Sequence, residues 1–202
     1  MAPPSLRVSR LVTEVDATTV LLISGSTRTA STNTAALRTV AAVAPPGITA
    51  RLYEWISALP AFNPDDDRYP LPPAVADLRA QIAGADAVLF CTPEYAGTLP
   101  GSLKNLLDWT VGGPEMYGQP AAWITVAAEG RGLGAEQTLA TVLGYINADI
   151  VQPACLRTPV RRDQVDPDGL ISDQAIRDTL TGALDAIAEH SANRRADAAT
   201  AG

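Results

Sequence analysis

The segment from Gly25 to Asn33 carries side chains that could hold a phosphate group. It reads Gly-Ser-Thr-Arg-Thr-Ala-Ser-Thr-Asn and lies between a short apolar run and an alanine-rich stretch, so we expect it to join a strand to the start of a helix. Backbone N–H groups at a helix start lack intrahelical partners and carry the positive end of the helix dipole. Ser26, Ser31 and Thr32 can add hydroxyl donors, and Arg28 can add a full positive charge. An ordinary turn capped by Ser31 would not require so many donors beside an arginine, so the segment predicts a phosphate site.

Several absences narrow the kind of phosphate that this segment could hold. It has no Gly-Lys-Ser or Gly-Lys-Thr ending, so it lacks the lysine and the metal-binding hydroxyl of a nucleoside triphosphatase. Gly25 is its only glycine, whereas a dinucleotide fingerprint needs spaced glycines. It contains no cysteine, which a cysteine phosphatase would need as a thiolate. A monophosphate fits the segment best.

The rest of the chain offers little for catalysis by side chains alone. Its single histidine, His190, falls in the last predicted helix, so neither a histidine-based catalytic centre nor a zinc site is expected. Cys91 and Cys155 match neither a disulfide framework nor a metal-ligand spacing, and we expect both to be small buried hydrophobes. We therefore expect no metal, no catalytic side chain, and chemistry that depends on a bound cofactor.

The bulk properties indicate one domain in the cytoplasm. A chain of 202 residues with 47% hydrophobic content can build one well-covered core. The formal charge of -7 argues against nucleic acid or an anionic membrane as a partner, because both would repel the chain. No apolar run is long enough to cross a bilayer, and the first residues lack a signal-peptide core. We expect an N-terminal extension over residues 1–17, a domain over 18–190 and a disordered tail over 191–202.

The elements that must position the phosphate segment alternate between strand and helix. Strands are predicted at residues 20–24, 48–53, 87–91, 121–127 and near 150, and helices at 32–44, 73–83, 102–109, 135–146 and 173–190. Such alternation predicts a doubly wound, flavodoxin-like α/β fold: a five-stranded parallel sheet in the order 2-1-3-4-5 with helices on both faces. The polar loops after strands one and three would meet where the strand order reverses, which is the usual ligand site of this class.

A second motif follows the third predicted strand and completes a family resemblance. Residues 92–109 read Thr-Pro-Glu-Tyr-Ala-Gly-Thr-Leu-Pro-Gly-Ser-Leu-Lys-Asn-Leu-Leu-Asp-Trp. Together with the first segment, this motif resembles the NADPH-dependent FMN reductase family over residues 20–149. The resemblance implies that the FMN phosphate binds at Ser26, Arg28, Ser31, Thr32 and Asn33, and that the isoalloxazine ring lies against Pro93, Glu94, Tyr95, Ala96 and Gly97. We expect structural roles for Lys104, Asn105, Asp108 and Trp109.

Two positions depart from the family pattern. Ala96 stands where the family commonly has Asn, which removes a side-chain hydrogen bond near the ring edge. The loop after the fourth strand, with Glu129 and Gly130, is also expected to contact the flavin. If Glu129 faces the ring, its charge would disfavour the reduced anionic flavin, and Arg131 could offset this or serve the pyridine nucleotide. Alternatively, both charged residues merely cap and solvate a turn.

The resemblance implies an NAD(P)H-dependent FMN or quinone reductase. Flavin N5 would accept hydride from NADPH or NADH and later pass electrons to a small-molecule acceptor, with ping-pong kinetics. It also implies a homodimer or homotetramer. Two other hypotheses remain open: an FMN-dependent electron carrier that docks redox partners, and a non-catalytic flavodoxin-fold protein.

Overall fold

Strands β1, β3 and β4 form the centre of a parallel sheet because they are apolar on both faces. β1 (Thr18–Ser24), β3 (Ala87–Cys91) and β4 (Pro120–Thr125) are almost entirely buried, as in strands that helices cover on both sides. β2 (Ile48–Tyr53) alternates between half-buried and exposed residues and lies at one edge. The computed structural model describes residues 17–200. Within them the order is β2-β1-β3-β4-β5 with parallel pairing, which confirms the predicted order.

The other edge of the sheet differs from the prediction of one short fifth strand. Two strands, β5 (Asp149–Ile150) and β6 (Leu156–Arg157), both pair with β4. A single 3-10 turn, Gln152–Ala154, separates them. Pro153 lies within this turn, and a proline has no N–H to donate to a sheet ladder. The edge strand is therefore interrupted and resumes one turn later.

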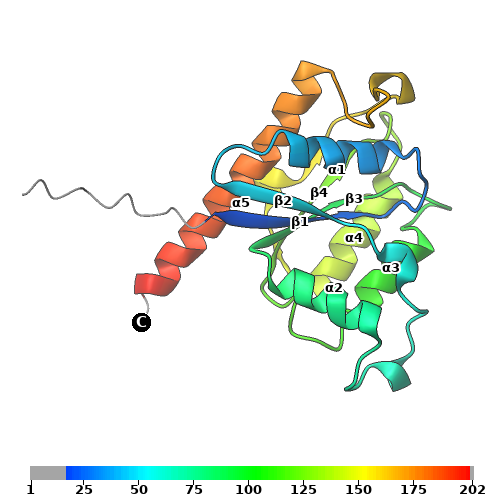
Figure 1. Cartoon of the computed structure of the whole chain (residues 1–202), viewed down its shortest axis with the longest axis vertical. Coiled ribbons are helices and arrows are strands. Elements are labelled where there is room, and N and C mark those ends of the chain that lie inside the picture. Colours follow the sequence, from blue (N-terminus) through cyan, green and yellow to red (C-terminus); the bar gives the residue numbers. More distant parts are fainter. Residues whose placement is uncertain (1–16, 201–202) are drawn as a thin grey trace, which may run out of the picture.

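Helices cover both faces of the sheet (Figure 1). The five helices are α1 (Thr32–Ala42), α2 (Pro73–Ala83), α3 (Gly101–Asp108), α4 (Leu133–Tyr145) and α5 (Gln174–Thr200). Successive residues of β1 serve two separate cores: Leu21 and Ile23 pack with α2, α3 and α4, while Val20 and Leu22 pack with α1 and α5. No helix within residues 17–200 is both long and apolar enough to cross a membrane.

Helix α5 is longer than the sequence pattern predicted. We expected it to end at His190 and residues 191–202 to be disordered, yet the helix continues to Thr200. Alanine and arginine are strong helix formers, and Arg194 and Arg195 form ion pairs with Asp149 and Asp86. These two ion pairs support the last helical turns of α5, which have no apolar face to pack against the core. Residues 1–16, most of the predicted extension, lie outside the described residues, and the domain limits stay a prediction.

The long segment between β2 and α2 is anchored to the end of α3. The guanidinium of Arg79 donates to the carbonyl oxygen of Trp109 at 2.9 and 2.7 Å and pairs with Asp67 at 2.7 Å. The Trp109 indole donates to the Pro60 carbonyl at 2.9 Å and packs edge-on against Phe62. The expected structural roles on α3 are confirmed, since Asn105 also bonds this segment and Lys104 pairs with Asp108.

We predict that Arg79→Met lowers the free energy of unfolding by about 3–5 kcal/mol, because it leaves the largely buried Asp67 carboxylate without its cation. Urea denaturation followed by circular dichroism measures this loss. Arg51→Met removes an exposed arginine from β2 and should change the stability by less than about 0.5 kcal/mol. Equal effects of the two substitutions would contradict the role assigned to Arg79.

Candidate functional site

A solvent-open cleft lies at the carboxyl ends of β1, β3 and β4. Its volume is about 470 Å3, and four separate segments line it. β1 and β3 are neighbours, with Ser24 beside Cys91. After β1 the chain passes to α1 on one face of the sheet, and after β3 it passes to α3 on the other face, so the cleft lies between the two connections. The lining residues are Ser26, Arg28, Ala30, Ser31, Thr32, Asn33, Pro93, Glu94, Tyr95, Val126, Ala127, Ala128, Arg131, Gly132, Val160, Arg161 and Arg162.

The first segment packs tightly against the start of the β3–α3 loop. The Gly25 N–H donates to the Cys91 carbonyl at 2.9 Å. A Cβ atom at Gly25 would lie 2.1 Å from the Thr92 hydroxyl oxygen and 2.6 Å from its Cβ. Any side chain at position 25 would therefore push the two loops apart, which explains the glycine at this position.

Hydrogen bonds within the same segment hold it in place at the start of α1. The Ser31 hydroxyl caps α1 by accepting from the Thr34 N–H, and the Ser26 hydroxyl accepts from the Arg28 N–H. The backbone N–H groups of Thr32 and Asn33, at the start of α1, have no acceptor among the described residues. Because the first N–H groups of a helix lack intrahelical partners, these two donors are available to an anion such as the predicted phosphate.

Asn33 connects the cleft to the sheet below it. Its side chain is buried, and its amide oxygen accepts from the Cys91 thiol at 3.4 Å. Burial raises the pKa of this thiol, so it stays protonated and serves as a donor rather than as a nucleophile. The expectation that Cys91 is a buried structural residue is confirmed.

The second predicted segment forms a tight turn that rests on α4. Tyr95 and Thr98 exchange two backbone hydrogen bonds, so Ala96 and Gly97 form a two-residue hairpin turn, with φ values of 50° and 77°. The Glu94 carboxylate accepts from the Gly134 N–H at 2.8 Å, at the start of α4. A Cβ at Gly134 would lie 2.0 Å from the Gly97 carbonyl oxygen, so glycine there permits this contact.

The third segment, between β4 and α4, is held in place by Arg157 of β6. The Arg157 guanidinium donates to the Arg131 carbonyl at 2.7 Å and pairs with Glu136 at 2.7 Å. Glu136 also accepts from the Thr125 hydroxyl at the end of β4. The loop is thereby fixed with Arg131 and Gly132 toward the cleft, while Glu129 is exposed outside it.

The structure brings together most of the residues that the sequence singled out. Two thirds of the predicted set line one cleft: Ser26, Arg28, Ser31, Thr32, Asn33, Pro93, Glu94 and Tyr95. Four do not line it, namely Ala96, Gly97, Glu129 and Gly130. Contact of all twelve residues with a flavin stays a prediction.

Sequence reasoning missed a fourth segment, which carries Val160, Arg161 and Arg162. The adjacent arginines after Pro159 were a signal for an anion site, but nothing in their spacing tied them to the first loop. Together with Arg28 and Arg131, these two arginines bring the number of arginines that line the cleft to four. Among the described residues, Arg161 forms an ion pair, with Asp163, and the other three form none. The cleft is therefore basic in a chain whose net charge is -7.

Comparisons with known proteins agree with this geometry. The model of a family described as NADPH-dependent FMN reductase matches residues 18–158. An NAD(P)H-dependent FMN reductase from Pseudomonas aeruginosa is 35% identical over 83% of this chain and 92% of its own. A quinone reductase from Escherichia coli is 31% identical over 84% and 93%.

Solved structures show the same fold. The flavoenzyme NAD(P)H:(acceptor) oxidoreductase from Paracoccus denitrificans superposes with a TM-score of 0.73 at 26% identity, covering 86% of this chain and 98% of its own. A WrbA-like flavodoxin from Agrobacterium tumefaciens superposes with a TM-score of 0.52 at 17% identity, covering 88% and 98%. The fold is therefore flavodoxin-like.

The turn at Ala96 generates a stability prediction. Ala96→Asn should raise the free energy of unfolding by about 0.5–1 kcal/mol, because asparagine tolerates a positive φ far better than alanine. Urea denaturation measures the gain. Ala61→Asn, in an exposed loop position without a positive φ, serves as the control and should give none. A gain at both positions, or at neither, would contradict the backbone explanation.

Proposed function

The chain belongs to the NADPH-dependent FMN reductase family, and on that premise we propose that it is an NAD(P)H-dependent reductase that passes electrons through FMN to a quinone or another small acceptor. The observation that carries this proposal is the basic cleft at the carboxyl ends of the strands, which the first segment, Ser26 to Asn33, lines together with small residues such as Ala127 and Ala128. Such a cleft fits a cofactor with a phosphate at one end and a flat ring at the other.

The phosphate end of FMN fits the first segment. A phosphate monoester carries a charge of about -1.5 to -2 at neutral pH and three strong acceptor oxygens. The free N–H groups of Thr32 and Asn33, the hydroxyls of Ser26 and Ser31, and the charge of Arg28 supply matching donors. The donors come from one loop that its own hydrogen bonds already hold, so little order has to be created on binding.

The ring end of FMN fits between the second and third segments. Pro93 and Tyr95 line the cleft from the second segment, and Ala127, Ala128 and Gly132 line it from the third. Small side chains and a glycine leave room for a flat ring, while Tyr95 is 48% exposed and offers an aromatic face with a polar tip.

The proposed reaction needs no acid or base from the protein. When bound, FMN supplies hydride acceptance and electron transfer, and the protein supplies binding and orientation. The carboxylate that lines the cleft, Glu94, is engaged by the Gly134 N–H. His190 pairs with Asp149, the first residue of β5. This pair therefore lies at the amino ends of the strands, away from the cleft at their carboxyl ends.

One cleft would serve both the electron donor and the acceptor, because the first, second and third segments all line the same cleft of one domain among the described residues. The nicotinamide must therefore leave before a quinone enters. This order supports ping-pong kinetics, and the names of the relatives support quinones as the acceptor class.

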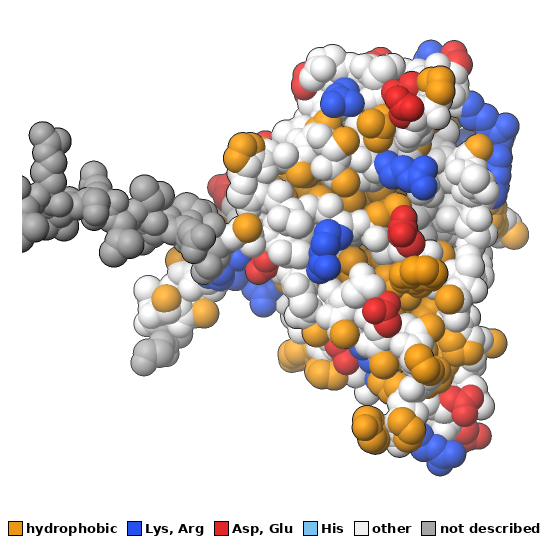
Figure 2. Space-filling model, viewed as in Figure 1, with side chains coloured by type: hydrophobic (Ala, Val, Ile, Leu, Met, Phe, Trp, Pro, Cys, Tyr) orange, Lys and Arg blue, Asp and Glu red, His pale blue; other side chains and the backbone are white. Residues whose placement is uncertain are grey.

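We also propose that the chain works as a homodimer or homotetramer. Large apolar side chains are exposed at Trp55, Tyr69, Tyr95, Leu133 and Tyr145. Figure 2 shows apolar side chains along the right and lower edge of the visible face, over the segment that links β2 to α2. Tyr95 and Leu133 adjoin the cleft, so a second copy seated there would help to cover the ring and exclude water.

An anaerobic absorption spectrum of the FMN-loaded protein tests the reductase proposal. NADPH or NADH should bleach the flavin rapidly, a quinone should restore its colour, and initial rates at varied donor and acceptor should give parallel double-reciprocal lines. Bound flavin that neither nucleotide reduces would favour the electron carrier, and failure to bind flavin would overturn the proposal.

Arg28→Ala tests the assignment of the phosphate site. It should weaken FMN binding about 10-fold or more, because a hydrogen bond to a charged group contributes about 1.5–3 kcal/mol. Riboflavin, which has the ring but no phosphate, should bind the variant and the native chain equally in a fluorescence titration. Arg51→Ala removes the same charge outside the cleft and should leave FMN binding unchanged. An equal loss for riboflavin would contradict the assignment.

A further inference from the structure

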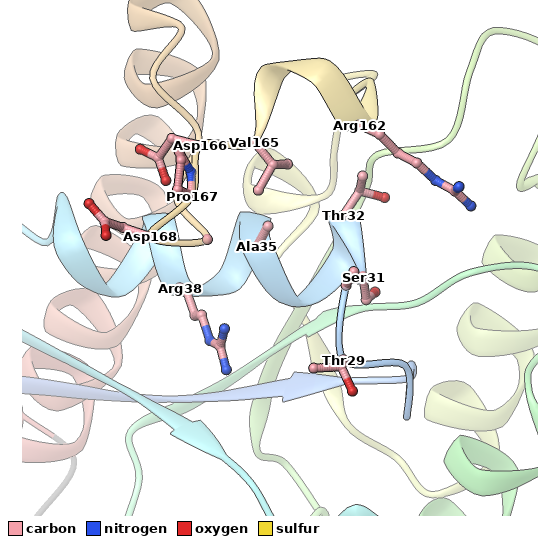
Figure 3. A pocket seen from close by; sticks show the side chains of 12 residues that line it. Thr29, Ser31, Thr32, Ala35, Arg38, Arg162, Val165, Asp166, Pro167 and Asp168 are labelled. Atoms are coloured by element: carbon pink, nitrogen blue, oxygen red, sulfur yellow. The ribbon is translucent and has the colours of Figure 1, made fainter.

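A second pocket adjoins the cleft beside the start of α1 (Figure 3). Its volume is about 360 Å3, and it lies between α1 and the segment 162–169 that precedes α5. It shares four lining residues with the cleft: Ala30, Ser31, Thr32 and Arg162. A ligand that extends out of the cleft over the start of α1 would therefore enter this pocket directly.

The pocket combines an apolar wall with two basic edges. Ala35, Val165 and Pro167 supply apolar surface, and Arg38 and Arg162 supply charge. Figure 3 shows the two arginines at different edges, Arg162 pointing away from the loop above α1 and Arg38 pointing below the helix. The ion pairs of the described residues include neither arginine. Apolar surface between two arginines without ion pairs fits a nucleoside whose ribose carries phosphates at two positions.

Two carboxylates also line the pocket and limit what it can hold. Asp166 accepts from the Leu170 N–H at 2.8 Å and so serves its own turn. Asp168 is exposed, and its neighbour Gly169 lies close to the Arg38 guanidinium, since a Cβ atom at Gly169 would be 3.3 Å from an Arg38 nitrogen. The Asp168 carboxylate would therefore repel a phosphate bound at Arg38 and weaken its binding.

We propose that this pocket binds the adenosine end of the pyridine nucleotide, with Arg162 beside the pyrophosphate and Arg38 beside the 2′-phosphate. The inference rests on the proposed function, which brings the nicotinamide into the cleft. The remainder of the dinucleotide then has to leave the cleft, and Arg162 lines both spaces along that path. Arg38 lies beyond it and would recognise a group that NADPH has and NADH lacks. The site thus prefers NADPH.

Arg38→Ala tests the proposal in the FMN-loaded protein. Its KM for NADPH should rise about 10-fold or more, with kcat and the KM for NADH unchanged within about 2-fold, because one charge-assisted contact to the 2′-phosphate is lost. Asp168→Asn removes a repelling charge and should lower the KM for NADPH instead. Arg51→Ala is the matched control, since it removes an exposed arginine that lines neither space, and it should change neither constant.

Direct binding gives a readout that does not depend on turnover. Calorimetric titration of the native chain should show adenosine 2′,5′-bisphosphate binding at least 10-fold more tightly than adenosine 5′-monophosphate, and Arg38→Ala should abolish that difference. An equal rise of both KM values, or equal affinity for the two adenosine phosphates, would overturn the assignment of Arg38. If the chain failed to bind FMN, the proposed function would fall, and the titration would still show whether the pocket binds the adenosine phosphates through Arg38.

Discussion

The contact between Gly25 and Thr92 is the constraint on which the site depends. β1 and β3 are adjacent strands, and the loops that follow them lead to helices on opposite faces of the sheet. A cleft can form between these two loops only if they start close together at the ends of the strands and then diverge. The Gly25 N–H bonded to the Cys91 carbonyl, and the absence of a side chain at Gly25, bring the two loops together at that edge. Beyond this point the first loop turns into α1 and the second turns toward α4, which leaves room for a ligand between them.

Each wall of the cleft is fixed by bonds that do not need a ligand. Ser31 caps α1, Glu94 holds the tight turn on the start of α4, and Arg157 holds the β4–α4 loop through the Arg131 carbonyl. A site built in this way loses little conformational entropy on binding, so more of the contact energy remains as affinity. In the proposed reaction the cofactor would supply the chemistry, and the side chains around the cleft would supply binding and support.

Charge is distributed so that an acidic chain presents a basic site. The net charge is -7, yet four arginines line the cleft, and Arg162 and Arg38 extend this basic character into the neighbouring pocket. Anionic cofactors and nucleotides would be attracted locally, while polyanions such as nucleic acids would be repelled at long range.

The sequence by itself determined the strand order and two of the four segments of the cleft. Alternating strands and helices permit few topologies, and Ser26 to Asn33 and Pro93 to Tyr95 each follow a strand that the order brings to one edge. Tertiary structure alone decided the rest. Whether Glu129 or Arg131 faces the cleft depends on the dihedral angles of a glycine-rich turn, and Ala96 proved to occupy a positive-φ position that its residue type does not reveal. Arg161 and Arg162 reach the cleft through the packing of segments far apart in the chain, and local residue patterns do not show that packing. Residues 191–200 contain alanine and arginine, which favour a helix locally, and the ion pairs of Arg194 and Arg195 with distant residues support it.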